Sequence, residues 1–257
     1  MKKILSVVLV LAMVLTGMCL FTSCDLADAA TVVQKAEEAL VNTPHVMTIS
    51  MKFNCENAEL NAIFSAMTME IPVTVDGENL SLSMNVGEAG TTTNLNMVIV
   101  DKVLYYNISV LGQEVKMKST LSEQDYAEFI KENSASMPVN PGHFETLTLE
   151  SKDGKKIITC SGISEEGRAA LNETLGDTLS GLTEEMSLSD LSYVLTIANG
   201  KYESMSLNVT YTMTVFDEPT TVSMIMDAAF TYTDVAPITA PADADSYTDM
   251  DVNDLLG

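Results

Sequence analysis

The sequence has no tryptophan, two histidines and four cysteines, and its basic residues are few. Thirteen Lys and Arg stand against 36 Asp and Glu, which gives a formal net charge of −23 at pH 7. Because such a negative field repels phosphate backbones, the composition excludes nucleic-acid binding as a function. The scarcity of histidine also leaves few residues that could act as a general acid or base near neutral pH.

The sequence also lacks the common motifs of catalysis and metal binding. It contains no His-Glu-x-x-His, no Gly-x-Ser-x-Gly and no phosphate-cradling glycine loop. We expect His45 and His143, each beside a Pro- or Gly-bearing loop, to be surface loop residues. The less favoured alternative is that they meet as a metal pair or provide a catalytic base. The sequence therefore predicts that the protein is not an enzyme and has no metal and no cofactor.

The N-terminal segment has the layout of an export signal. Lys2 and Lys3 supply a positive start, and residues 4–21 form an apolar run. The small residues Thr22 and Ser23 then precede Cys24. This arrangement resembles the bacterial lipobox, in which small residues mark a cleavage site before a cysteine that becomes acylated. The resemblance implies a signal peptide at residues 1–23 and a lipid anchor on Cys24.

Two features depart from the lipobox pattern. Phe21 stands where the pattern prefers Leu, and Cys19 is a rival cysteine, although the bulky Met18 before it disfavours cleavage there. The alternative is an uncleaved transmembrane anchor, because 18 apolar residues reach the lower limit of a membrane-spanning helix. In the favoured interpretation the protein is bacterial and lies on the extracytoplasmic face of the cell membrane.

Cleavage would leave 257 − 23 = 234 residues, which suffice for one domain with a core that needs no disulfide framework. We expect a polar tether at residues 24–30 and a single domain at residues 31–242. An extended, poorly ordered segment begins at Val235 and ends in an acidic tail at residues 243–257.

Two cysteines remain in the predicted domain. An environment outside the cytosol permits a disulfide between Cys55 and Cys160. Lone cysteines are also common in protein cores, where a free thiol behaves as a small apolar group. The sequence leaves both possibilities open.

Alternation of apolar and polar residues dominates the rest of the chain and predicts half-buried strands. Met47, Ile49, Met51 and Phe53 share one face of the first strand, and nine or ten such strands follow the same rule. Tight turns, of which Asn199-Gly200 is the strongest signal, separate most of them. This pattern is typical of a meander of antiparallel hairpins.

Three amphipathic segments interrupt the strands and predict helices at residues 31–41, 122–132 and 164–180. Strands with one apolar face need a cover, and strands as long as residues 205–215 favour a barrel over a sandwich. We therefore predict an α+β, mainly β fold. A strongly curved antiparallel sheet would form an unclosed β-barrel, and the helices would cover its concave face.

A cysteine of lipobox type, a leading helix, a many-stranded meander and a final Pro-Ile-Thr-Ala-Pro stretch resemble the LolA/LppX-like bacterial lipoproteins. The resemblance spans most of residues 31–242 and rests on layout. It implies an unclosed β-barrel with a helical lid and a hydrophobic cavity for acyl chains.

Many of the 17 methionines fall on predicted inward positions of the strands. Methionine is flexible and polarizable, so it suits either a promiscuous lipid cavity or plain filling of the core. The residues predicted to line a ligand are Met51, Phe53, Met97, Tyr106, Met213, Met224 and Phe230.

The sequence thus favours a non-enzymatic, membrane-anchored lipoprotein that binds or carries a lipid or another hydrophobic molecule at the cell envelope. The alternative is a closed-core scaffold or interaction module without a ligand. Such a module would present its Thr-rich outer sheet face to another envelope protein.

Overall fold

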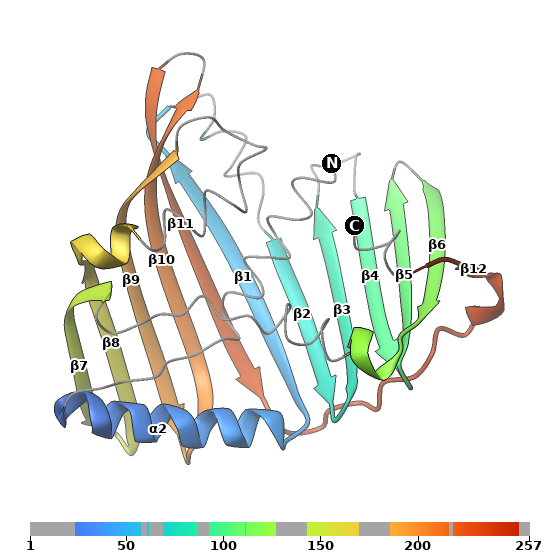
Figure 1. Cartoon of the computed structure of the whole chain (residues 1–257), viewed down its shortest axis with the longest axis horizontal. Coiled ribbons are helices and arrows are strands. Elements are labelled where there is room, and N and C mark those ends of the chain that lie inside the picture. The colour runs from blue at the N-terminus through green and yellow to red at the C-terminus, as the bar shows by residue number, and fades with distance from the viewer. Residues whose placement is uncertain are drawn as a thin grey trace.

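A computed structural model shows that almost all of the alternating segments join one sheet (Figure 1). The structure describes residues 24–57, 61, 69–86, 93–110, 112–126, 143–169, 186–215 and 218–251. The sheet has twelve strands in the order β12-β6-β5-β4-β3-β2-β1-β11-β10-β9-β8-β7. It is curved and unclosed, as the sequence predicts.

The strand bounds follow the predicted alternation closely. The strands are β1 (His45–Cys55), β2 (Met69–Asp76), β3 (Asn79–Val86), β4 (Thr93–Val100), β5 (Val103–Val110), β6 (Gln113–Thr120), β7 (Phe144–Lys152), β8 (Lys155–Ile163), β9 (Met186–Ala198), β10 (Lys201–Val215), β11 (Glu218–Thr231) and β12 (Thr248–Asp249). Every neighbouring pair is antiparallel except β12 with β6.

Two-residue turns set the register of the hairpins. Asn199 and Gly200, between β9 and β10, both have positive φ, as do Asp153 and Gly154 between β7 and β8. Positive φ at both central residues is the requirement of a type I′ turn, whose twist matches that of the strands. The turn residues therefore fix which side chains of each hairpin share a face.

One long helix, α2 (Cys24–Val41), packs across β7–β11 near the ends that carry these turns (Figure 1). Ala29, Val33 and Ala36 are fully buried and recur at helical spacing, so one stripe of the helix faces the sheet. This finding corrects the predicted tether at residues 24–30. That stretch is helical because it is rich in alanine, and Ala29 belongs to the buried stripe.

The other predicted helices are described in part. Residues 123–126 and 165–169 are helical, and the remainder of 122–132 and 164–180 lies outside the described residues. No helix among the described residues is long and apolar enough to cross a membrane, and the apolar run 4–21 lies outside them.

The C-terminal segment is the second correction. Residues 235–251, called the strap below, run from the end of β11 along the sheet to its far edge (Figure 1). There they form a short 3-10 helix, η2 (Ala244–Ser246), and β12, which pairs with β6. Tyr247 is buried between these two elements. The predicted poorly ordered tail is thus an ordered part of the fold up to Asp251, and residues 252–257 lie outside the described residues.

Candidate functional site: the inner face

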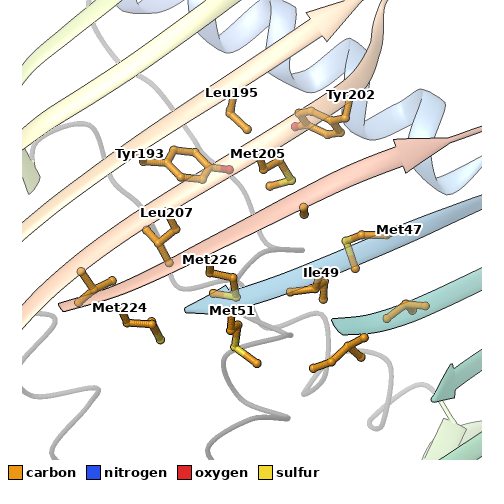
Figure 2. Close-up of a cluster of buried hydrophobic side chains, with 14 of the residues drawn as sticks. Met47, Ile49, Met51, Tyr193, Leu195, Tyr202, Met205, Leu207, Met224 and Met226 are labelled. Carbon is orange, nitrogen blue, oxygen red and sulfur yellow. The ribbon is translucent and has the colours of Figure 1, made fainter. Parts of the chain in front are cut away.

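The inner face, which is the apolar face of the curved sheet, is organised in rows of side chains that cross neighbouring strands. In one row Met51 of β1 lies directly opposite Met226 of β11 and Met69 of β2. Directly opposed residues of antiparallel strands have Cβ atoms about 4.5–5.5 Å apart, so the three thioether side chains are neighbours. Figure 2 shows Met51 and Met226 on the same face of the sheet.

A second row is longer and gathers three of the predicted lining residues. Its members, from β11 to β6, are Phe230, Met47, Val73, Leu82, Met97, Tyr106 and Met117. Two further predicted lining residues, Phe53 and Met224, lie directly opposite each other on β1 and β11. The structure therefore brings six of the seven predicted residues onto one continuous face.

Met213 is the seventh predicted lining residue. Its backbone pairs with Met186 on β9 and Thr220 on β11. Its side chain lies outside the described residues. Its predicted role is untested.

Burial divides the predicted lining residues into two sets. Met51, Met97 and Met224 have exposed fractions of 0%, 6% and 3%. Phe53, Tyr106 and Phe230 are only partly buried and pack against the core. The three methionines are therefore shielded from solvent, and the three aromatic residues reach the surface.

A cluster of aromatic and basic side chains closes one end of the inner face. The rings of His45 and Phe230 lie 6.3 Å apart, those of His45 and Tyr232 lie 5.9 Å apart, and those of Tyr202 and Phe230 lie 5.7 Å apart. Lys201 places its ammonium 4.8 Å from the centre of the Tyr232 ring, a cation–π contact. The cluster therefore gives one end of this apolar face a polar character.

The buried position of His45 corrects the expectation of a surface loop residue. His45 is the first residue of β1 and continues the inward alternation of Met47, Ile49 and Met51. Its Nδ1 atom lies 2.9 Å from the carbonyl oxygen of Thr43. Burial lowers its pKa, so the imidazole is neutral at pH 7. The alternation of apolar and polar residues along β1 extends to position 45, and this signal could have placed His45 on the inner face.

His143 is also buried, which again differs from the expected surface loop. Its carbonyl oxygen accepts a hydrogen bond from the Ser164 amide over 2.8 Å. Gly167 approaches His143 so closely that a Cβ atom there would lie 2.4 Å from that carbonyl oxygen. The lack of a side chain on Gly167 is what lets this turn pack over His143.

The two histidines do not form a pair. His143 immediately precedes β7 and His45 begins β1, five strands apart in the sheet. Among the residues that the structure describes, no group of three or more His, Cys, Asp or Glu side chains is placed to hold a metal ion.

The two cysteines of the domain are both free thiols. Cys55 ends β1, and Cys160 lies on β8, four strands away in the sheet. Four strand spacings amount to about 19 Å along the sheet, whereas a disulfide needs Cα atoms within about 7 Å. The disulfide is therefore not formed, and the alternative of lone cysteines holds. Burial raises the pKa of Cys160 to about 11, so this thiol stays protonated at pH 7.

One carboxyl group on the helix has an unusual pKa. Glu37 of α2 is next to the buried Ala36 and is itself half-buried. Desolvation by burial raises the pKa of Glu37 to about 7. A group with this pKa changes its charge near neutral pH, in the helix that covers the inner face.

The fold and this face define a class of protein: an unclosed, mostly antiparallel sheet with a continuous apolar inner face, covered among the described residues by the helix α2. Residues 26–245 match a family model described as "Family of unknown function (DUF6612)", and the chain belongs to this family. No curated protein matches the chain.

One solved structure with similarity to the chain is the crystal structure of MucB in complex with MucA(peri). It is 8% identical in sequence, and the match covers 83% of this chain and 100% of that chain. The TM-score is 0.14, which is too low to carry an argument about fold or function.

Proposed function

We propose that the protein is a non-enzymatic lipoprotein, anchored through Cys24 at the extracytoplasmic face of a bacterial membrane, that binds a lipid or similar hydrophobic molecule. The observation that supports binding is the continuous apolar inner face, on which flexible methionines in the centre adjoin partly buried aromatic residues. In this proposal the half-barrel works as the LolA/LppX-like lipoproteins are expected to work, by sheltering acyl chains.

The anchor part of the proposal rests on the lipobox-like stretch Leu20–Cys24. Cys24 belongs to α2, and the family match begins two residues later. An acyl chain on Cys24 would therefore be joined directly to the helix that covers the inner face. A domain held this close to the bilayer suits loading or shielding of a lipid.

Metabolic labelling with an alkyne-bearing fatty acid tests the anchor. Cys24→Ala is expected to abolish labelling, and Cys19→Ala is the matched control, since it removes the rival cysteine and should leave labelling unchanged. Equal labelling of Cys24→Ala and the unaltered chain would contradict acylation at Cys24. An unlabelled chain that stays in the membrane with residues 1–23 attached would indicate an uncleaved anchor instead.

Native mass spectrometry of the detergent-solubilised full chain tests ligand binding. We expect a co-purified lipid, and we expect Phe53→Asn to reduce its occupancy because Phe53 is partly buried on the inner face. Ile225→Asn is the matched control, since Ile225 is partly buried on the outer face, next to Met224, the residue opposite Phe53. Absence of any bound lipid would contradict the ligand proposal.

A second candidate function is a closed-core module that binds another envelope protein. The observation in its favour is the burial of Met51, Met97 and Met224, which core packing alone explains. Its outer face would supply the contacts through hydroxyl pairs such as Thr210 with Ser223, 3.1 Å apart. One stoichiometric protein partner in membrane pull-downs, with no lipid bound, would support this candidate over the first.

A further inference from the structure

The two edges of the sheet differ in how they end. The β6 edge is covered by the strap, whose strand β12 pairs Thr248 with Met117 and Asp249 with Lys118. At the other edge, β7 pairs with β8, and no described strand pairs with its outer side. An uncovered edge strand presents unpaired N–H and C=O groups that can accept a strand from another chain.

The strap is held on β6 by contacts of several kinds. The Lys116 ammonium lies 2.8 Å from the Asp243 carboxylate, and Lys118 lies 4.0 Å from that of Asp249. The Tyr247 ring meets the Tyr105 ring edge-on, with centroids 5.4 Å apart. The strap thus occupies both the backbone edge of β6 and the outer side chains beside it.

The direction of β12 is informative. Ten antiparallel steps separate β6 from β7 in the sheet, so β6 and β7 run in the same direction. A second copy placed beside β6, with its inner face on the same side, would therefore bring its β7 to β6 in parallel. The chain's own β12 is parallel to β6 as well. The short strand takes the place and the direction that β7 of another copy would take.

The side chains of the two edges are complementary in one parallel register. With Leu149 of the second copy beside Met117, Leu147 falls beside Val115, and all four belong to inner faces. On the outer side Glu150 then falls beside Lys118, where Asp249 of the strap lies in the intact chain. Sliding β7 by two residues in one direction places two ammonium groups, Lys152 and Lys118, beside each other. Sliding it in the other direction places the charged Glu145 beside the apolar Val115. The register that pairs Leu149 with Met117 is therefore the favoured one.

We propose that the strap caps the β6 edge against β7 of a second copy and so prevents head-to-tail growth of the sheet. Such a contact is heterologous, and because it uses different surfaces on the two partners it leads to open chains instead of closed dimers. The strong negative charge of each copy opposes the contact, but at physiological ionic strength charges more than about 8 Å apart are largely screened. The edge contact itself is short-range and therefore survives screening.

The test compares the full chain with a chain that ends at Ala242, both in the same detergent at physiological salt. Native mass spectrometry is expected to show a monomer for the full chain and a concentration-dependent series of dimers, trimers and longer species for the shortened chain. A shortened chain that is folded by circular dichroism and monomeric at every concentration would overturn the proposal.

Two matched substitutions in the shortened chain identify the surface. Thr148→Lys places a second ammonium beside Lys116 and is expected to weaken self-association about two- to fivefold. Thr146→Lys introduces the same side chain on the same exposed face of β7, but beside Glu114, and should leave self-association unchanged or stronger. Equal effects of the two substitutions would overturn the proposed β6–β7 contact.

A full-length variant covers the case in which the shortened chain does not fold. Asp243→Ala combined with Tyr247→Ala removes the ion pair and the ring contact of the strap while keeping every residue of the sheet. We expect fast amide exchange in residues 243–251 together with the same oligomer series at high concentration. An open strap in a chain that stays monomeric would overturn the proposal.

Discussion

Strands β9, β10 and β11 are 13, 15 and 14 residues long and lie beneath α2, whereas β2–β6 have eight residues each and end at the strap. The helix is attached by apolar burial through Ala29, Val33 and Ala36. The strap is attached by the pairing of β12 with β6, by ion pairs and by one aromatic contact. The helix-covered half, β7–β11, should therefore respond to changes in packing, and the strap half, β2–β6, to salt and pH.

The largest effect is expected from a cavity at the centre of the sheet. Met226→Ala on β11 removes a fully buried side chain and should lower the free energy of unfolding by about 2–5 kcal/mol. Met117→Ala on β6 is the comparison, since Met117 is only partly buried and should cost about 1 kcal/mol or less. Urea unfolding measures both, with Met226→Leu as a volume-conserving control. Equal losses at the two positions would contradict the difference between the halves.

The next effect is expected at the strap. Tyr247→Ala removes a ring that is 7% exposed and packs against Tyr105. Local opening of residues 243–251 should become easier by about 1–3 kcal/mol, because a buried aromatic side chain contributes about that much. Amide hydrogen exchange measures the opening, and exchange in β9–β11 should not change. Faster exchange throughout the sheet would mean that the strap supports the whole fold.

A rise in pH should lower the stability of the helix-covered half, whereas a fall in pH should open the strap. The pKa of Glu37 is raised above its unfolded value of 4.5 to about 7, so its burial costs stability increasingly as pH rises from 4.5 to 7. After allowance for its half-exposed position, Glu37→Gln should add about 1 kcal/mol at pH 8 and nothing below pH 4. Urea unfolding at the two pH values measures the difference. A gain at pH 4 equal to that at pH 8 would contradict the raised pKa.

The attachment of the strap should depend on pH in the opposite direction. The hydrogen bond from Lys116 lowers the pKa of Asp243 below its ordinary value of 3.8. The contribution of Asp243 is therefore present above that ordinary value and is lost as pH falls through the lowered pKa. Amide exchange of residues 243–251, corrected for the intrinsic pH dependence of exchange, should show the strap opening in acid. Asp245→Asn, on a neighbouring exposed carboxylate, is the control and should not change this response.

The smallest effect is expected from salt. Lys116→Gln breaks the ion pair with Asp243 and should speed exchange in the strap at low salt, with little difference at 1 M NaCl because exposed ion pairs are screened. Lys52→Gln, an exposed lysine on β1, is the matched control and should leave the strap unchanged. A strap that responds equally to both substitutions would not depend on this ion pair.

Much of the fold could be predicted from short-range patterns. The alternation around Met51, Leu82 and Met97 gave the inward face of each strand correctly, since successive side chains of a strand point to opposite sides. Pro72 lies on a stretch of β2 just before the pairing with β3 begins at Val73, where a missing N–H is tolerated.

The candidate site was predictable to the same extent. Six of the seven predicted lining residues share the inner face, because strand period decides facing. Burial did not follow from the pattern, since cover by distant segments decides it. His45 was missed because the neighbouring Pro44 suggested a loop, although the alternation already reached position 45.

Alternation and turn chemistry settled which residues point inward and where the chain reverses, because both depend on neighbours within a few residues. The tertiary structure decided the pairings across long sequence separations. β1 joins β11 and so merges two meanders into one sheet, and β12 returns to β6. These pairings depend on closing long loops and on packing that no local pattern encodes. For the same reason, a C-terminal segment that looks disordered by composition becomes the strap when Lys116, Lys118 and Tyr105 are brought beside it.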